Sequence, residues 1–308
     1  MLAKFKYLKG FGMLTRIIAV IFSSFVTVLS TSIPLFLFYP ELADGMILML
    51  VVILLLGSFL THGLLTHIVN DLADFKSGTD DYSPGMLSGG SRVIQNKLFT
   101  YSQLKYFGVI LSTVMLITAI LFFIFGHIEL GILTIIGIWG ALSYSIKPFS
   151  FAYRPLMGEW LSLFPSMLAL GLAAPWIMLD TIPLWAWFNA GINAIWCMAW
   201  VMVHHIPDID ADQRARPVKL TTVLYAANKW GRRAAHMPAV LYLILVAVLA
   251  VIMTSTRGLA GLVTQIISIV TVLMLFDMKN RDVEAVTAVE KKMLIMAAVT
   301  AIFLGLAI

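Results

Sequence analysis

The sequence predicts an all-α membrane protein, a polytopic bundle of about nine transmembrane helices. Apolar residues make up 60% of the 308 residues, charged residues only 12%, and the mean hydropathy is +0.95. Soluble domains contain about 25% charged residues, so this composition excludes a soluble domain. Nine apolar runs approach or exceed the length of about 20 residues that crosses a bilayer as a helix. We expect residues 1–308 to form a single membrane-embedded domain.

The first run, 14–38, follows a basic start, but it is too long for a secretory signal and has no small-residue cleavage site. We therefore expect it to be the first membrane helix. The following runs are 46–69, 104–126, 128–146, 160–179, 184–206, 236–254, 258–276 and the short 292–308. Only Gly126-His127-Ile128-Glu129 separates the third run from the fourth. The single cysteine, Cys197, lies inside the sixth run and is expected to be a buried small apolar side chain.

The basic residues predict how the chain is oriented. If the N-terminus is cytoplasmic, every Lys and Arg except Arg257 falls on the cytoplasmic side, where such an excess is normal. We therefore expect a multi-pass protein of the cell membrane with its N-terminus in the cytoplasm and its C-terminus outside. The net charge of +5 follows from this topology and gives no reason to expect a nucleic acid as partner. Most acidic residues also fall on this side, so we expect the active site to face the cytoplasm.

Two acid-rich segments stand where apolar runs end. The first is Asn70-Asp71-Leu72-Ala73-Asp74, with Asp80 and Asp81 after it, and the second is Asp208-Ile209-Asp210-Ala211-Asp212. They follow the second run and the sixth, which suggests two four-helix pseudo-repeats plus a last helix around a central cavity. A single site between the two halves follows from this arrangement.

Helical spacing predicts which of these side chains share a face. Residues three or four apart are neighbours on a helix surface. Asn70, Asp71 and Asp74 are therefore expected to point toward one cavity, and Asp208 and Asp212 are expected to do the same. Asp210 lies on the other side of its turn and is expected to be solvated.

Carboxylates in this arrangement suit a divalent cation and a polyanion. Mg²⁺ binds through one or two protein carboxylates together with phosphate oxygens of the substrate. Mg²⁺ and neighbouring Lys or Arg side chains stabilise the charge that develops on a leaving diphosphate. Acids at a helix end are often only solvated surface, but two matched segments on one face favour a diphosphate site with an apolar tail in the bundle.

Asn70-Asp71-x-x-Asp74 and Asp208-x-x-x-Asp212 resemble the paired aspartate motifs of the UbiA superfamily of intramembrane prenyltransferases. Tyr144-Ser145-x-x-Pro148, with Tyr153-Arg154 and Gly158-Glu159 after it, is similar to a further signature of that family. The resemblance covers essentially the whole chain. It implies nine helices around a central cavity and Mg²⁺ as cofactor. The implied partners are a polyprenyl diphosphate, which donates the prenyl group, and the surrounding membrane lipid.

Two further segments resemble one branch of this superfamily. Phe75-Lys76-Ser77-Gly78-Thr79-Asp80 and Gly89-Gly90-Ser91-Arg92-Val93-Ile94 are similar to the branch that prenylates 1,4-dihydroxy-2-naphthoate in menaquinone synthesis. This resemblance implies an aromatic, lipid-soluble acceptor. A lipid or a carotenoid acceptor on the same fold is the alternative, and the sequence does not decide between them.

The resemblance also implies roles for individual residues. Asp71, Asp74, Asp208 and Asp212 would be the catalytic aspartates, with Asn70, Asp71 and Asp74 holding one Mg²⁺ and Asp208 and Asp212 the second. The expected substrate-binding residues are Asn70, Lys76, Asp80, Arg92, Tyr144, Arg154 and Lys219. Surface charge is the alternative reading for the basic residues among them, and packing at a helix end is the alternative for Tyr144, whose ring would face an allylic cation.

The chain departs from the family pattern at three places. Gly78 stands where many members carry a third acid, so Asp80 or Asp81 is the candidate replacement. His204-His205 replaces a common Asn and is interpreted as a polar helix end, because successive helical residues diverge by about 100°. Within 214–222 the Lys of the usual motif is displaced to Lys219.

A membrane transporter is the rival from another functional class. Transport pathways place ionisable side chains at the bilayer midplane. We expect no ionisable side chain near the middle of any of the nine runs, which favours an enzyme.

Overall fold

The computed structural model describes residues 2–84 and 90–308, with side chains from residue 6 onward. Its α-helices are α1 (Leu2–Leu14), α2 (Ile17–Val20), α3 (Val26–Phe38), α4 (Asp44–Ser58), α5 (His67–Ser77), α6 (Tyr101–Ile124), α7 (Ile128–Ser145), α8 (Phe164–Met178), α9 (Leu184–His204), α10 (Ile209–Arg214), α11 (Thr222–Trp230), α12 (Met237–Asp277) and α13 (Val283–Leu306). Three π-helical segments, η1 (Ile21–Phe25), η2 (Phe59–Thr66) and η5 (Gly158–Leu163), and three 3₁₀ turns, η3 (Thr79–Asp81), η4 (Phe151–Tyr153) and η6 (Arg232–Ala234), complete the set. The described residues contain no β-strand, which confirms the all-α prediction.

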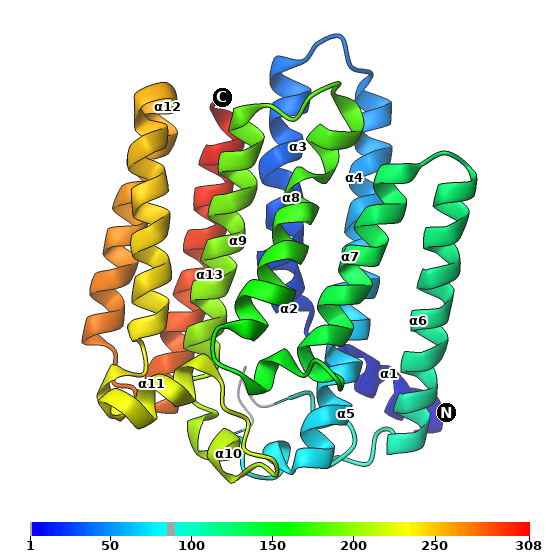
Figure 1. Ribbon diagram of the computed structural model, residues 1–308, viewed down its shortest axis with the longest axis vertical. Helices are drawn as coiled ribbons and strands as arrows, with labels where there is room; N and C mark the ends of the chain where they lie inside the picture. Colours follow the sequence, from blue (N-terminus) through cyan, green and yellow to red (C-terminus); the bar gives the residue numbers. More distant parts are fainter. Residues whose placement is uncertain (1, 85–89) are drawn as a thin grey trace.

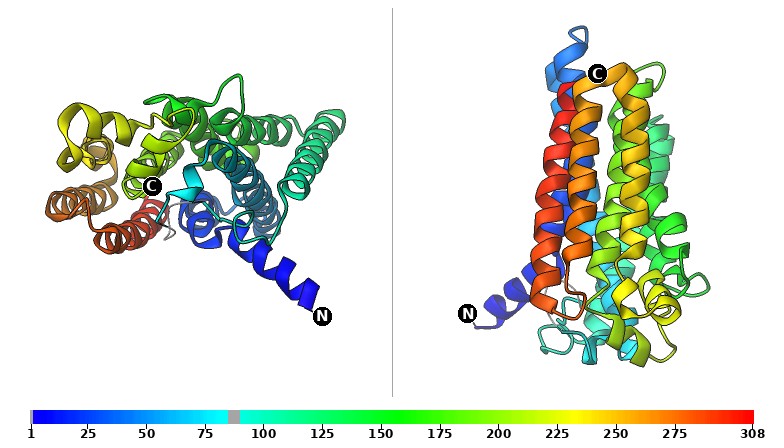
Figure 2. Two further views of the ribbon diagram at one scale, coloured as in Figure 1. Left: turned by 90° about the horizontal axis from the view of Figure 1, so that it is seen from below. Right: turned by 90° about the vertical axis from the view of Figure 1, so that its left-hand side faces the viewer.

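The long helices stand side by side in one bundle (Figure 1). Helix α9 is buried along most of its length and packs against α8 and α12, while α3 packs against α13 and α8. The short helices α5, α10 and α11 gather at the lower end of the bundle in Figure 1, together with the N-terminus, and the C-terminus lies at the opposite end. Helix α1 projects sideways from the lower end (Figure 2).

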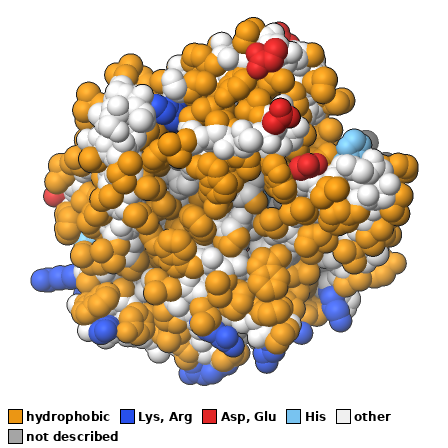
Figure 3. All heavy atoms as spheres, turned by 45° about the horizontal axis from the view of Figure 1, so that its top comes forward, with side chains coloured by type: hydrophobic (Ala, Val, Ile, Leu, Met, Phe, Trp, Pro, Cys, Tyr) orange, Lys and Arg blue, Asp and Glu red, His pale blue; other side chains and the backbone are white. Residues whose placement is uncertain are grey.

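Seven helical stretches of the described chain are long and apolar enough to cross a membrane. Large apolar side chains such as Leu48, Ile124 and Leu259 are exposed on the outside of the bundle, as expected for a surface that lipid covers. Figure 3 shows this apolar surface with Lys and Arg side chains gathered at the lower rim and acidic side chains near the upper end. The polytopic membrane bundle that the sequence predicts is therefore present.

Two predicted runs have other boundaries in the structure, and two more are joined at a kink. α4, η2 and α5 form one continuous helical stretch from Asp44 to Ser77, so the first acid segment lies inside this helix rather than after it. The runs 236–254 and 258–276 are the two arms of α12 (Figure 2), which has non-helical backbone angles at Arg257. The last run, predicted to begin at 292, is part of α13, a longer helix that begins at Val283. The exact number of membrane spans stays a prediction.

Arg257 joins three helices at the end of the bundle remote from the acid segments. Its side chain is buried, and its guanidinium donates hydrogen bonds to Asn189 Oδ1 (2.7 Å) and to the Leu304 carbonyl oxygen (2.5 Å). Asn189 lies on α9 and Leu304 on α13, so one cation fixes the turn of α12 against both helices.

We predict that Arg257→Met destabilises the protein by about 2 kcal/mol, because Asn189 and Leu304 would lose a charged donor in a buried site. Thermal unfolding in detergent micelles measures this loss. Arg233→Met, at an exposed position on η6, is the matched control and should leave the transition temperature unchanged. Equal transitions for the two variants would contradict the role given to Arg257.

Candidate active site

A cavity of about 1170 Å³ lies inside the bundle. Its wall is apolar over most of its length, where α4, α6, α7 and α8 contribute Leu, Val, Met and Phe side chains. One end is polar and is lined by Arg16, Asn70, Asp74, Asp80, Ser91, Arg92, Asp208, Asp212 and Lys219. The two acid segments thus meet at one site, as the sequence predicts, although they lie far apart in the chain.

The first segment reaches this site on the last turns of α5. Gly78 ends the helix in the left-handed conformation (φ 75°), which a residue without Cβ adopts at little cost. Asn70 and Asp74 lie one turn apart on the cavity side, and Asn70 Nδ2 donates to Asp74 Oδ2 (2.8 Å). A helix-ending glycine therefore occupies the position where many family patterns have an acid.

Asp71 is buried but is not among the residues that line the cavity. The backbone N–H of Ser91 donates to its Oδ1 (3.1 Å), and the Ser91 hydroxyl donates to its Oδ2. The guanidinium of Arg16 lies 3.6 Å from the same carboxylate. The expected common face for all three polar residues of α5 is thus limited to Asn70 and Asp74, because Asp71 does not line the cavity and its oxygens bind Ser91.

The second segment forms the start of α10. Asp208 and Asp212 are both buried and both line the cavity, whereas Asp210 is exposed and pairs with Arg232 at 2.6 Å. Ser83 donates to Asp208 Oδ1 (2.5 Å). Burial raises the pKa of both cavity carboxyls above the usual range. The inward positions of Asp208 and Asp212 and the outward position of Asp210 are those that helical spacing predicts.

Lys219 connects the second half of the chain to the first segment. Its Nζ donates to Asp74 Oδ1 (2.7 Å) and Oδ2 (3.0 Å), and its side chain is buried. Burial alone lowers the pKa of this lysine, but the Asp74 and Asp212 carboxylates outweigh burial and hold the pKa well above its usual range. Lys219 is therefore a fixed positive charge at the polar end of the cavity.

Asp80, and not Asp81, faces the cavity. Asp80 is buried on η3 and accepts a hydrogen bond from Gln95 (3.2 Å), while Asp81 is exposed. Gly90, with φ 69°, lies so close that an added Cβ would stand 2.5 Å from Asp80 Oδ1. Gly89, the other glycine of this segment, lies outside the described residues.

The remaining predicted residues divide into two groups. Arg92 lines the cavity and donates to the Ser83 carbonyl oxygen, and Tyr144 lines it with its hydroxyl hydrogen-bonded to His205 Nε2 (3.1 Å). Lys76 and Arg154 are exposed, and neither lines the cavity. The expectation that these two cations meet the substrate has no support in this arrangement, because both side chains face outward.

The two adjacent histidines form hydrogen bonds with different partners. His204 Nδ1 lies 2.8 Å from Glu290 Oε1 on α13, whereas His205 contacts Tyr144 on α7. Burial, followed by the charge of Lys219, lowers the pKa of His205 well below its usual range. The two rings do not share a ligand, as their helical separation predicts.

Sequence reasoning missed three residues of the polar end. Arg16 stands at the break between α1 and α2 with φ 41°, and its Nη2 is buried without a hydrogen-bond partner. Ser83 and Ser91 hold Asp208 and Asp71. Arg16 is a charged residue at the start of an apolar run, and Ser91 lies in the segment 89–94 that resembles the naphthoate branch, but no pattern marks Ser83.

The donor atoms at this end fit Mg²⁺. They are carboxylate and amide oxygens, the hard ligands that Mg²⁺ prefers. Asp80 Oδ1 and Asp212 Oδ1 are buried without a hydrogen-bond partner, which leaves them available to a cation. In the described part of the chain, no group of three or more His, Cys, Asp or Glu side chains encloses a metal by itself.

The model of the UbiA prenyltransferase family matches residues 27–297. The chain belongs to this family. It is therefore an enzyme that takes a prenyl group from a prenyl diphosphate and transfers it to a lipid-soluble acceptor in the membrane. No curated protein and no solved structure matches the chain. Family membership favours the prenyltransferase over the rival transporter.

We predict that Gly90→Ala strongly lowers the prenyltransferase activity, because the new methyl group would collide with the Asp80 carboxylate. Prenyl transfer in reconstituted vesicles measures the loss. Gly126→Ala is the matched control, since Gly126 also has a positive φ (81°) but open space around it. Equal activity of the two variants would contradict the predicted collision with Asp80.

A second prediction concerns stability without divalent cations. Burial, and after it the charges of Asp74 and Asp71, raise the pKa of Asp80 to about 8. The folded state thus binds this proton more tightly than the unfolded state, so the stability contributed by Asp80 falls as the pH rises from about 4 to about 8. Asp80→Asn should therefore raise the transition temperature at pH 8 in a chelator, and less so at pH 5.

Asp81→Asn provides the control for this measurement, because Asp81 is the exposed neighbour. Its transition temperature should equal that of the parent protein at both pH values. A lower transition temperature for Asp80→Asn at pH 8 would show that this carboxylate stabilises the cation-free fold.

Proposed function

We propose that this enzyme catalyses Mg²⁺-dependent transfer of a polyprenyl group from its diphosphate to an aromatic quinone precursor such as 1,4-dihydroxy-2-naphthoate. The observation that carries the proposal is the meeting of two acid segments at the polar end of one long apolar cavity. An amphipathic diphosphate ester has the same division between a polar head and an apolar chain.

Basic side chains support a diphosphate at this end. Lys219, Arg16 and Arg92 line the same part of the cavity as the acids. Their charges attract the diphosphate and stabilise the negative charge that grows on it as the carbon–oxygen bond breaks. Arg16 has a buried Nη2 without a partner, so it is able to donate to a phosphate oxygen without losing an existing hydrogen bond.

Asn70, Asp74, Asp80, Asp208 and Asp212 would hold Mg²⁺, and the bound ion would neutralise phosphate charge as a Lewis acid. We assign Asp71 a positioning role instead, because it does not line the cavity and its oxygens bind Ser91. It orders the segment that carries Gly90 and Arg92 beside the cavity.

The apolar wall suits the prenyl chain and the reactive carbon. Leu111, Val114, Met115 and Phe122 line the cavity on the α6 side, where the chain is able to lie without burying polar groups. Water would quench an allylic cation, and an apolar cavity limits its access. Tyr144 also lines the cavity, and its ring would face such a cation.

The acceptor assignment rests on the resemblance of the segments around Lys76 and Arg92 to the naphthoate branch. A lipid or carotenoid acceptor is the alternative outcome. We also propose that the polar end faces the cytoplasm. The N-terminus and most basic side chains lie at that end of the bundle (Figures 1 and 3), as the excess of cytoplasmic Lys and Arg requires.

Product formation with a labelled polyprenyl diphosphate tests the proposal. Purified protein in lipid is incubated with 1,4-dihydroxy-2-naphthoate, other quinone precursors, a glycerol phosphate or a carotenoid, with Mg²⁺ or with a chelator. We expect a prenylated naphthoate only in the presence of Mg²⁺. If product forms only with the glycerol phosphate or the carotenoid, that compound replaces 1,4-dihydroxy-2-naphthoate as the acceptor. Product formed in the chelator would refute the metal requirement.

Three aspartates of one segment offer a matched set of variants for this assay. Asp208→Asn and Asp212→Asn should each lower turnover by at least about 100-fold, because each removes a carboxylate from the cavity. Asp210→Asn should leave it unchanged, since Asp210 is exposed and pairs with Arg232. Equal losses in all three variants would argue against the assignment.

A further inference from the structure

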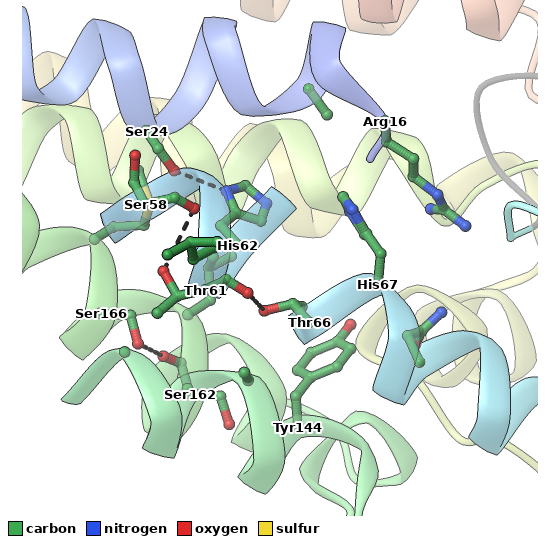
Figure 4. A pocket seen from close by; sticks show the side chains of 18 of the residues that line it. Arg16, Ser24, Ser58, Thr61, His62, Thr66, His67, Tyr144, Ser162 and Ser166 are labelled. Carbon is green, nitrogen blue, oxygen red and sulfur yellow. Dashed lines mark hydrogen bonds between the residues drawn. The ribbon is translucent and has the colours of Figure 1, made fainter. Parts of the chain in front are cut away.

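The apolar part of the cavity contains a polar cluster that the diphosphate site does not use. It consists of Ser24 on η1, Thr61 and His62 on η2, and Ser162 on η5, all of which line the cavity. Figure 4 shows these side chains gathered within the helices. We call them the inner polar cluster. His62 overturns the expectation that no ionisable side chain lies near the middle of a predicted membrane helix, because it lies well inside the stretch from Asp44 to Ser77.

The backbone supports a functional reading of this cluster. Its members lie on the three π-helical segments of the described chain, whereas Ser58 and Ser166, which also line the cavity, lie on α4 and α8. Isolated π-helical turns are rare and occur frequently at functional sites. Three segments far apart in the sequence therefore bring irregular turns and polar side chains to one level of the same cavity.

Hydrogen bonding leaves one member free to bind a ligand. Thr61 donates to the Gly57 carbonyl oxygen (2.9 Å), and the Ser162 hydroxyl is hydrogen-bonded to that of Ser143 (2.7 Å). Ser24 fixes His62 through Nδ1 (2.7 Å). Among the described residues none bonds the other ring nitrogen, Nε2, of His62. His62 is half-buried and lines the cavity, so this nitrogen is open to a ligand there.

The prenyl donor does not satisfy this nitrogen. Its chain has no polar atoms, and its diphosphate belongs at the charged end. At 1.5 Å per residue, His62 lies about 12 Å along the helix from Asn70, which leaves room for an aromatic ring between them. A ring that presents a hydroxyl to His62 would direct its opposite side toward the reacting end of the donor.

We infer that the inner polar cluster is the acceptor subsite and that His62, held by Ser24, forms a hydrogen bond with a ring hydroxyl of an aromatic acceptor. This inference deepens the proposed function and rests on its aromatic acceptor. It assigns the residue that selects a hydroxylated ring over a purely apolar one.

Equilibrium binding of two probes without the donor tests the inference. The probes are 1-hydroxy-2-naphthoate and naphthalene-2-carboxylate, which differ by one hydroxyl group. Binding is followed through quenching of tryptophan fluorescence, since Trp200 lines the cavity. We expect the parent protein to bind the hydroxylated probe about tenfold more tightly, and His62→Phe to lose this preference while binding of the other probe is unchanged.

Three further variants make the result specific. His62→Gln restores a hydrogen-bonding group and should recover part of the preference, and Ser24→Ala should weaken it by freeing the ring. His127→Phe makes the same change at an exposed histidine outside the cavity and should have no effect. If the thermal transition shows that His62→Phe does not fold, the binding preferences of His62→Gln and Ser24→Ala decide whether the inference holds.

Two results would overturn the inference: a parent protein that binds neither probe or does not distinguish them, and a His62→Phe variant that keeps the preference. Failure of the proposed function gives a different result. In that case the parent protein binds the hydroxylated probe through His62 but forms no prenylated 1,4-dihydroxy-2-naphthoate from geranylgeranyl diphosphate and Mg²⁺.

Discussion

The ion pair between Lys219 and Asp74 is the contact on which the polar end of the cavity depends. Several carboxylates lie buried near one another, and without cations their charges would repel and would favour solvent. Lys219 Nζ binds both oxygens of Asp74, and Arg16 approaches Asp71. Lys219 and Arg16 are far in sequence from the acids that they contact. The carboxylate charges are therefore balanced only when the tertiary structure has formed.

The same constraint explains why the site is at one end of the bundle. Charged groups are expensive inside the membrane, so the chain confines the acid segments to helix ends, on α5 and α10. The apolar helices then form a cavity that begins at these charges and continues between α6, α7 and α8. A prenyl diphosphate has this polarity along its own length, which is why the family's chemistry fits the arrangement.

Local patterns in the sequence predict the bundle and much of the site. Run length predicts that long membrane helices are present, though not where α5 ends or α13 begins. Helical spacing is sufficient for the inward Asp208 and Asp212 and the outward Asp210. Position within a motif does not predict contacts made by loops. Asp71 turns to Ser91, and Lys76 faces outward, because these orientations depend on segments distant in the chain. His62 was missed for a related reason, since a single histidine scarcely changes the hydropathy of its run.

Calorimetric titration with a geranylgeranyl thiolodiphosphate, which resists ionisation, tests whether the acid segments bind the diphosphate through Mg²⁺. In this account the acid segments bind the diphosphate through Mg²⁺, so the titration should show binding with Mg²⁺ and none in a chelator. The basic side chains alone do not suffice, because Lys219 is occupied by Asp74. Equal affinity with and without Mg²⁺ would contradict the account and would assign the diphosphate to Arg16 and Arg92 instead.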